Sequence, residues 1–211
     1  MVTPEEHVDG RDGPLEPAPC GRARRLKRLL DLVFALALLP LLLPLMAVIA
    51  ALIKLTSKGP ALYWSDRIGR DNITFRMPKF RTMRMGTPAV ATHLLSDAER
   101  YLTPVGSVLR KTSLDELPQL FSVIAGRMGF VGPRPALFNQ EDLVTLRTER
   151  GVHRLVPGVT GWAQVNGRDE LPIPVKVEYD AEYLRRGSLS FDLKILILTA
   201  VRVLRGEGVS H

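Results

Sequence analysis

The longest feature of the hydrophobic pattern is a run without charged residues from Leu32 to Ile53. Five basic residues between positions 22 and 28 precede it, and Lys54 and Lys58 follow it. At roughly 1.5 Å per residue, a straight helix of this length would reach about 33 Å, enough to cross a hydrocarbon core of about 30 Å. The pattern therefore predicts a membrane-associated helix, for which a transmembrane span is the simplest interpretation.

Two features of this run favour a different topology. Pro40 and Pro44 each remove a backbone donor and favour a kink. Basic residues flank both ends, whereas a single-pass helix usually has one basic and one less basic flank. A bent helix that enters and leaves by the cytoplasmic face accounts for both features, and each cation near the anionic leaflet gains on the order of 1 kcal/mol. We therefore predict a re-entrant helix-break-helix anchor over residues 22–58.

Shorter patterns follow the anchor. Gly59-Pro60 marks a turn, and residues 61–64 and 73–77 are typical of two short strands joined around residues 67–72. Residues 153–168 are rich in Gly and Pro, which predicts a long loop, and such loops are more often functional than idle.

Helical patterns dominate the rest of the chain. We expect an amphipathic helix at 136–150, a polar helix at 175–186 and a last helix from about 191 to 205, which is too short to span a membrane. This last helix either lies in the membrane interface or belongs to the core. The predicted fold class is α/β of the α+β type, with a compact, mostly helical domain and a small sheet over residues 59–211.

Composition and charge limit the partners. The 211 residues are 45% hydrophobic and 24% charged, with a pI near 9.9, which suits one well-cored domain. Residues 1–20 hold one Arg and five acids, so the remainder carries 28 basic and 17 acidic residues. That basic body suits an anionic partner such as nucleic acid, anionic lipid or a phosphorylated substrate. Residues 1–21, with many Pro and Gly, predict a disordered tail.

Metal-thiolate and disulfide chemistry find no support. Cys20 is the only cysteine, and the four histidines show no zinc-binding spacing. No Gly-rich phosphate loop is present either, so arginines and a metal ion are the candidates for binding phosphate.

The densest candidate chemistry is the pair Asp115-Glu116, followed by Gly-Pro-Arg-Pro at 132–135. Adjacent acids face different directions on a helix, so they would divide a task, one as nucleophile and the other holding a metal or a proton. The prolines on either side of Arg134 offer no N–H, so the polar capacity of this segment lies mostly in one guanidinium group, whose planar fork suits phosphate.

A structural interpretation of the same residues stays open. Ser113-Leu-Asp-Glu fits the capping-box pattern, in which Asp115 and Glu116 stabilise the first turn of a helix. Pro118 would then occupy a helical position that needs an N–H. A helix that begins at Asp115 avoids this conflict and places both carboxylates at a positive N-terminus, where anionic ligands also bind.

Three segments together resemble the bacterial sugar transferase family, the small monotopic polyprenyl-phosphate phosphoglycosyltransferases. They are Leu-Asp-Glu-Leu-Pro-Gln-Leu at 114–120, Phe-Val-Gly-Pro-Arg-Pro at 130–135 and Pro-Gly-Val-Thr-Gly-Trp-Ala-Gln-Val-Asn-Gly-Arg at 157–168. Any one of them would be weak, but all three stand in the family's order, and the resemblance runs from about residue 27 to 210. It implies the same re-entrant topology, in which Pro44 matches the break proline, although Leu43 replaces a common serine and Pro40 is additional.

The resemblance implies a set of active-site roles. Asp115 would be the nucleophile, and Glu116 would help with the metal or the acceptor, so both are candidate metal ligands. Arg134, Arg110 and Lys79 would bind substrate phosphate. From the residues alone, a solvated basic strand edge is the favoured interpretation of Lys79. Arg110 is equally well explained as a surface arginine at a helix end.

The resemblance also implicates the loop at 157–168 in forming the nucleotide-sugar side of the site. Its candidate binding residues are Gly161, Trp162, Gln164 and Asn166, with an indole for stacking and amides for hydrogen bonding.

The implied activity is transfer of a sugar 1-phosphate from a UDP-sugar to polyprenyl (undecaprenyl) phosphate, with release of UMP and a covalent aspartyl phosphosugar intermediate. It would be the first membrane step in assembling a glycan, whether exopolysaccharide, O-antigen or glycoprotein. The implied cofactor is Mg²⁺, the partners are both substrates and membrane lipids, and a homo-oligomer is compatible with the sequence. The expected location is the cytoplasmic face of the bacterial inner membrane.

Two alternatives remain at this point. The acceptor could attack directly, without a covalent intermediate, or the chain could be a non-catalytic, lipid-binding membrane adaptor. Nucleic-acid binding has the charge but lacks a motif, and the apolar run disfavours it.

Overall fold

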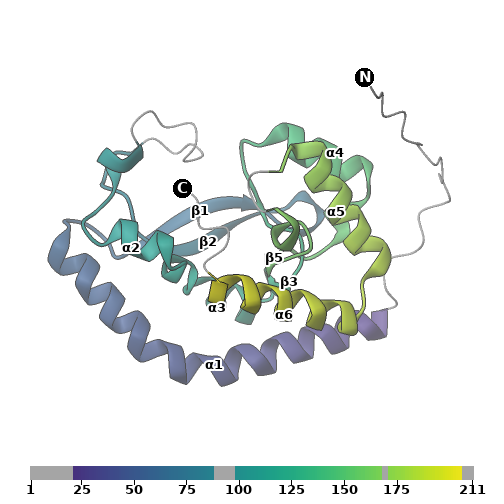
Figure 1. Ribbon diagram of the computed structural model, residues 1–211, viewed down its shortest axis with the longest axis horizontal. Helices are drawn as coiled ribbons and strands as arrows, with labels where there is room; N and C mark the ends of the chain where they lie inside the picture. Colours follow the sequence, from purple (N-terminus) through teal and green to yellow (C-terminus); the bar gives the residue numbers. More distant parts are fainter. Residues whose placement is uncertain (1–20, 88–97, 168–170, 206–211) are drawn as a thin grey trace.

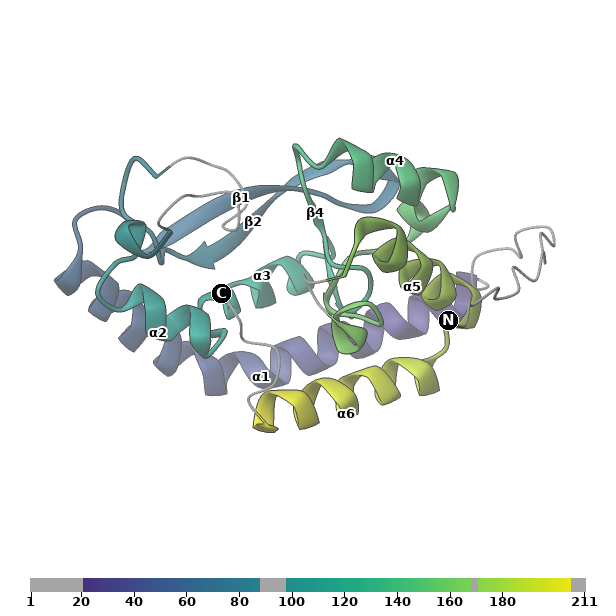
Figure 2. The same cartoon turned by 45° about the horizontal axis from the view of Figure 1, so that its top comes forward.

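The computed structural model describes residues 21–87, 98–167 and 171–205, so residues 1–20 of the predicted N-terminal tail lie outside it. Gly21, the last residue of that predicted tail, is instead the first residue of a helix. A long helix, α1 (Gly21–Thr56), runs along one side of a body of shorter helices and small sheets (Figures 1 and 2). The mixed helix-and-sheet class and the long apolar N-terminal helix are therefore confirmed.

Helix α1 continues through Pro40 and Pro44, which both lie inside it, and its ribbon curves beneath the body (Figure 1). A proline inside a helix removes one hydrogen bond and crowds a carbonyl of the preceding turn, which bends the helix. Of the described helices, only α1 is long and apolar enough to cross a membrane, by length and composition. The structure shows a bend in one helix and no interruption, so the re-entrant topology stays a prediction.

One face of α1 packs against the body along its length. Ala35, in the N-terminal half, is buried against Phe75 and its neighbours. Ile53, near the C-terminal end, is buried with Phe80 and Leu109. Large apolar side chains remain exposed on other faces of the helix, among them Leu36, Leu41, Val48, Leu52 and Leu55. The body therefore covers only part of the apolar surface of α1.

The main sheet has the order β2-β1-β4 and is antiparallel. Strands β1 (Leu62–Ile68) and β2 (Thr74–Phe80) form a hairpin. A short strand, β4 (Ala136–Leu137), pairs with the end of β1. The predicted hairpin is confirmed and is longer at both strands than the alternation indicated.

A second, parallel pair joins β3 (Gly129–Val131) to β5 (Gly158–Thr160). The backbones approach so closely that a Cβ atom at Gly158 would lie 2.1 Å from the amide nitrogen of Gly132. Glycine is required for this contact because any side chain would collide with backbone. The pairing fixes the start of the Gly-Pro-Arg-Pro segment, which connects β3 to β4.

Two short helices precede β3. Helix α2 (Gly106–Lys111) leads into the 3₁₀ turn η4 (Leu114–Glu116), and α3 (Gln119–Ile124) follows. Helix α3 packs against both α1 and β2. The turn that carries the acidic pair therefore lies between α1 and the hairpin.

The C-terminal half contains α4 (Glu141–Glu149), α5 (Ile173–Arg186) and α6 (Leu189–Arg205). The two last helices confirm the sequence prediction, and α6 lies alongside α1 (Figures 1 and 2). The predicted helix at 136–150 was wrong at its start, because residues 136–137 pair with β1 instead. The predicted loop at 153–168 was likewise wrong at β5, whose parallel partner is distant in sequence.

Helix α6 offers a direct test of the core. Ile195 is fully buried, whereas Ile197 is 56% exposed two residues later on the same helix. We expect Ile195→Ala to lower the free energy of unfolding by about 2–5 kcal/mol, because it leaves a cavity in the core. Ile197→Ala is the matched control and should cost less than about 1 kcal/mol. Chemical unfolding in detergent measures both values, and equal losses would contradict the packing described.

Candidate active site

The acidic pair lies on η4, a 3₁₀ turn that begins after a strained residue. Ser113 has a φ of 57°, in the left-handed region, and its side chain makes no capping hydrogen bond. The capping-box interpretation was therefore wrong. Pro118 has no N–H to continue a helix from Ser113, and the regular helix α3 starts only at Gln119. The carboxylates are left free to take distant partners.

Glu116 is the acid that binds other side chains. Its Oε1 accepts hydrogen bonds from Lys79 Nζ at 2.7 Å and from Arg134 Nη2 at 3.0 Å. Burial by itself would raise the pKa of Glu116, but the charges of Arg134 and Lys79 outweigh it and hold that pKa well below 4.5. Glu116 therefore stays ionised and fixes both cations.

Asp115 has the opposite environment. Asp115 is only 9% exposed, yet no residue that the structure describes donates a hydrogen bond to its carboxylate. Burial, with a smaller contribution from Glu116, raises the pKa of Asp115, and Lys79, Arg110 and Arg134 oppose this rise. Its lone pairs are free while its charge is balanced by nearby cations, which is the state that a carboxylate nucleophile needs.

Arg110 reaches the same cluster from α2. Its Nε donates to Thr82 Oγ1 at 3.0 Å, and its charge acts on Asp115. Thr82 is buried just after β2, so the contact ties α2 to the strand that carries Lys79. Three cations, Lys79, Arg110 and Arg134, thus surround two carboxylates, and the excess positive charge suits an anionic substrate.

The carboxylates of Asp115 and Glu116 are of the kind that binds Mg²⁺. Among the described residues no group of three or more Asp, Glu, His or Cys could hold a metal by itself. Mg²⁺, however, is usually held by one or two carboxylates together with substrate phosphates and water. Asp115, whose oxygens accept no hydrogen bond from a described residue, and Glu116 match that arrangement.

The loop at 157–168 divides into two parts, with Arg168 outside the described residues. Gly161 lies against residues 132–135, hereafter the arginine segment, since a Cβ at position 161 would be 2.1 Å from Gly132 O. Trp162 points elsewhere: its Nε1 donates to Glu182 at 2.6 Å, and its ring lies 5.0 Å from that of Phe191.

The two amides of this loop also differ. Asn166 Nδ2 donates to Trp162 O at 2.7 Å. The side-chain nitrogen and oxygen of Gln164 are buried, with no hydrogen bond to any described residue. The roles of Gly161, Trp162, Gln164 and Asn166 towards a nucleotide stay predictions.

Two arginines that the sequence analysis did not single out hold the arginine segment. Arg67 of β1 donates to Pro135 O at 3.2 Å, and Arg147 of α4 donates to Arg134 O at 2.8 Å. Neither belongs to a motif, and neither has a local partner that periodicity would reveal. Only the register of the hairpin and the docking of α4 bring them to the segment.

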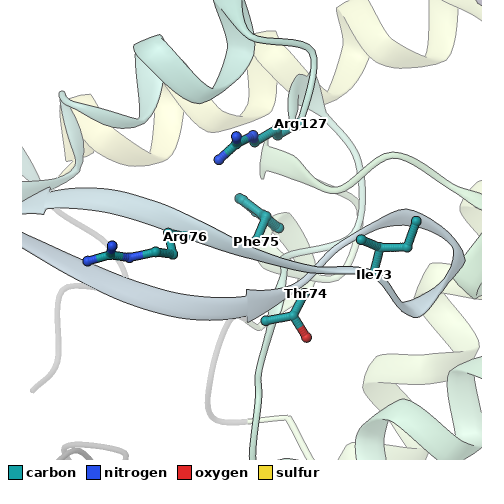
Figure 3. Close-up of a pocket in the computed structure, with 5 residues that line it drawn as sticks. All are labelled: Ile73, Thr74, Phe75, Arg76 and Arg127. Atoms are coloured by element: carbon teal, nitrogen blue, oxygen red, sulfur yellow. The ribbon is translucent and has the colours of Figure 1, made fainter.

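A hollow of about 400 Å³ lies away from the acids and is lined by Ile73, Thr74, Phe75, Arg76 and Arg127 (Figure 3). None of the two acids and three cations of the acidic cluster lines this hollow, so the hollow is separate from the cluster.

The Glu116 cluster predicts a pH-dependent contribution to stability. At pH 7, Glu116→Gln should lower the free energy of unfolding by about 1–3 kcal/mol, because two charge-assisted hydrogen bonds are lost. The pKa of Glu116 is lowered in the folded protein, so this advantage of the native sequence is present above pH 4.5 and is lost as the pH falls below it. Denaturant unfolding across pH 3–8 measures it. Exposed Glu149→Gln is the control, and a difference that does not change with pH would contradict the prediction.

Known proteins resemble this chain over most of its length. Residues 22–206 match the family described as bacterial sugar transferase. The chain is 40% identical over 198 residues to the UDP-glucose:undecaprenyl-phosphate glucose-1-phosphate transferase of Escherichia coli (strain K12), covering 90% of this chain and 42% of the relative. It is 36% identical over 201 residues to the UDP-N-acetylgalactosamine-undecaprenyl-phosphate N-acetylgalactosaminephosphotransferase of Aeromonas hydrophila, covering 93% of this chain and 47% of the relative.

A shorter relative matches almost end to end. The uncharacterized sugar transferase EpsL of Bacillus subtilis (strain 168) is 40% identical over 186 residues, covering 88% of this chain and 91% of the relative. The chain thus spans less than half of the two longer relatives and most of EpsL. With the family match over nearly its whole length, the chain belongs to the bacterial sugar transferase family.

Proposed function

We propose that this chain transfers a sugar 1-phosphate from a UDP-sugar to undecaprenyl phosphate or a similar polyprenyl phosphate, releasing UMP. The reaction would be the first membrane step of a glycan such as an exopolysaccharide. Support comes from the names of the relatives, which pair a UDP-sugar with undecaprenyl phosphate. The sugar differs among them, so the donor is specified here only as a UDP-sugar.

The difference between the two adjacent acids carries the proposal. Glu116 is held by Lys79 and Arg134, whereas the Asp115 carboxylate accepts no hydrogen bond from a described residue. A carboxylate whose lone pairs are free can attack phosphorus, and one engaged by two cations is better suited to hold them in place. Asp115 is therefore the nucleophile of the proposed reaction.

The proposed chemistry consists of two displacements. An Asp115 carboxylate oxygen attacks the sugar-linked phosphorus, the bond between that phosphorus and the UMP oxygen breaks, and UMP leaves with the electron pair. An oxygen of the polyprenyl phosphate then attacks the same phosphorus, and the bond to Asp115 breaks, which restores the carboxylate. Splitting the transfer means that the water-soluble and the membrane-bound substrate need not meet at once.

Charge neutralisation is the main task of the surrounding residues. Phosphoryl transfer depends on positioning and electrostatic stabilisation, because the attacking carboxylate approaches a centre that is already negative. Arg134, Arg110 and Lys79 provide positive charge at this point. A bound Mg²⁺ would neutralise further charge on the pyrophosphate, with Asp115 and Glu116 as the residues that would hold it.

The packing of α1 supports a location on one face of the membrane. Near its N-terminus, Arg28 donates to Val123 O at 2.5 Å and to Ile124 O at 2.7 Å. Beyond its C-terminus, Lys58 O accepts from Arg81 Nη1 at 2.6 Å. Both ends are therefore tied to one body, whereas the ends of a spanning helix lie about 30 Å apart in different aqueous phases. We place both ends at the cytoplasmic face of the inner membrane, with the uncovered apolar surface of α1 in lipid.

Mass spectrometry tests the covalent step. We expect detergent-purified protein, incubated briefly with Mg²⁺ and a panel of UDP-sugars without acceptor, to gain the mass of one phosphosugar at Asp115 and to release UMP. Asp115→Asn should form no adduct and lose at least about a thousandfold in turnover, because the amide is a poor nucleophile. The control Asp142→Asn changes an exposed acid on α4 and should behave as the native sequence.

Each other outcome contradicts part of the proposal. No adduct and no UMP, in protein that forms lipid-linked product once polyprenyl phosphate is added, would favour direct transfer. No product with any donor, together with no effect of UDP-sugars and Mg²⁺ on thermal stability, would favour the membrane adaptor.

Cysteine labelling tests the topology. In a Cys20→Ser background, single cysteines at exposed Ala23 and Lys58 should react with a membrane-impermeant maleimide from the cytoplasmic side alone, because the body holds both ends of α1. A cysteine at exposed Ser190 reports the side on which the body lies. Labelling of positions 23 and 58 from opposite sides would show that α1 spans the membrane.

A further inference from the structure

The segment that carries Arg134 cannot hold itself in place. Pro133 and Pro135 have no N–H, so the segment offers few backbone donors of its own. Its three successive carbonyl groups, from Pro133 to Pro135, take their hydrogen-bond donors from other parts of the fold. Gly158 N donates to Pro133 O at 3.0 Å, Arg147 Nη1 to Arg134 O at 2.8 Å, and Arg67 Nη1 to Pro135 O at 3.2 Å. Each carbonyl thus takes its donor from a different element of the fold.

The donor to Arg134 O is itself held by a buried carboxylate. Arg147 is only 8% exposed, and its Nε and Nη2 donate to Asp180 Oδ2 at 2.9 Å and 2.6 Å. Asp180 lies on α5 and is 1% exposed. The guanidinium group of Arg147 therefore donates two hydrogen bonds to the buried carboxylate of Asp180 and a third to the backbone of Arg134, the residue that binds Glu116.

The space behind the segment makes this hydrogen bond matter. A cavity of about 30 Å³ is lined by Pro133, Arg134, Pro135, Arg147 and His153, among others. A space of this size is large enough for a water molecule. Packing behind the segment is therefore incomplete, and the contact from Arg147 restrains the backbone where side-chain packing does not.

We infer that Arg147 and Asp180 are positioning residues for the transfer reaction: the buried pair clamps the carbonyl of Arg134 and so keeps its guanidinium on Glu116 beside Asp115. Neither residue touches the acids, and both act through the backbone of Arg134. The inference rests on the proposed function for its kinetic test and on geometry alone for its structural test.

The fold provides a matched control for this pair. Arg150, the residue directly after α4, contacts Glu178 of α5 at 2.7 Å, but the side chains of this pair are 58% and 53% exposed, and no hydrogen bond or ion pair among the described residues joins them to the arginine segment. Arg150→Gln removes the same charge as Arg147→Gln, three residues further along the chain. Any effect confined to position 147 therefore reports the contact with Arg134.

We expect Arg147→Gln to lower kcat by about 10- to 100-fold, with a smaller change in KM, because misplacing a charge-stabilising group by about 1 Å can cost about 100-fold. Arg150→Gln should change kcat by less than about twofold. In an Arg134→Ala background, Arg147→Gln should have little further effect, since both changes then remove the same contribution.

A second variant keeps the test valid if a lone buried charge prevents folding. The double variant Arg147→Met with Asp180→Leu removes both charges and fills their space with apolar side chains of similar volume, a replacement that folded proteins often tolerate. This double variant should fold, as judged by thermal unfolding, and should lose about as much kcat as Arg147→Gln.

Amide hydrogen exchange judges the clamp without the reaction. Peptides covering residues 129–137 should exchange about tenfold faster in Arg147→Gln and in the double variant than in the native sequence or Arg150→Gln. Unchanged exchange there, or kinetic losses at positions 134 and 147 that multiply, would overturn the inference. A native chain that releases no UMP with any donor would refute the proposed function, while the exchange result would still decide whether the clamp exists.

Discussion

The structure around the site depends on one carboxylate that binds two cations. Glu116 joins Lys79 of the hairpin to Arg134 of the β3–β4 segment, and it does so from a turn that lies between α2 and α3. Three parts of the chain are thereby fixed to one another at a single oxygen atom. Its neighbour Asp115 feels the same cations but accepts no hydrogen bond from a described residue, which leaves its lone pairs available for the proposed attack on phosphorus.

The anchor helix and the site are connected by hydrogen bonds as well as by apolar packing. Arg28 of α1 binds the carbonyls at the end of α3, and Lys27 binds Asp192 of α6 at 2.5 Å. Asp192 also accepts from Tyr183 at 2.7 Å, and β3 lies next to this group. A helix that contacts the body at these points fixes the position of the acids relative to α1, which the proposed reaction between a soluble donor and a lipid acceptor would need.

Much of the site could be predicted from motifs, and its geometry could not. The sequence singled out Asp115, Glu116, Arg134, Arg110 and Lys79, and the structure brings all five together. It did not show which acid binds the cations, and the capping-box pattern at Ser113 pointed to a local partner that Glu116 does not use. Arg147 and Asp180 carried no signal at all, because their contact joins α4 to α5 and is decided when those helices pack.

The sequence by itself determined the local features: the long apolar helix, the hairpin, the last two helices and the order of the acidic and arginine segments. Each follows from periodicity or backbone preference, which act over a few residues. Tertiary structure alone decided the parallel β3–β5 pair, the start of α4, the uninterrupted course of α1 and the partners of Glu116. These depend on contacts between residues far apart in the chain, whose free energy is gained only when the elements pack together.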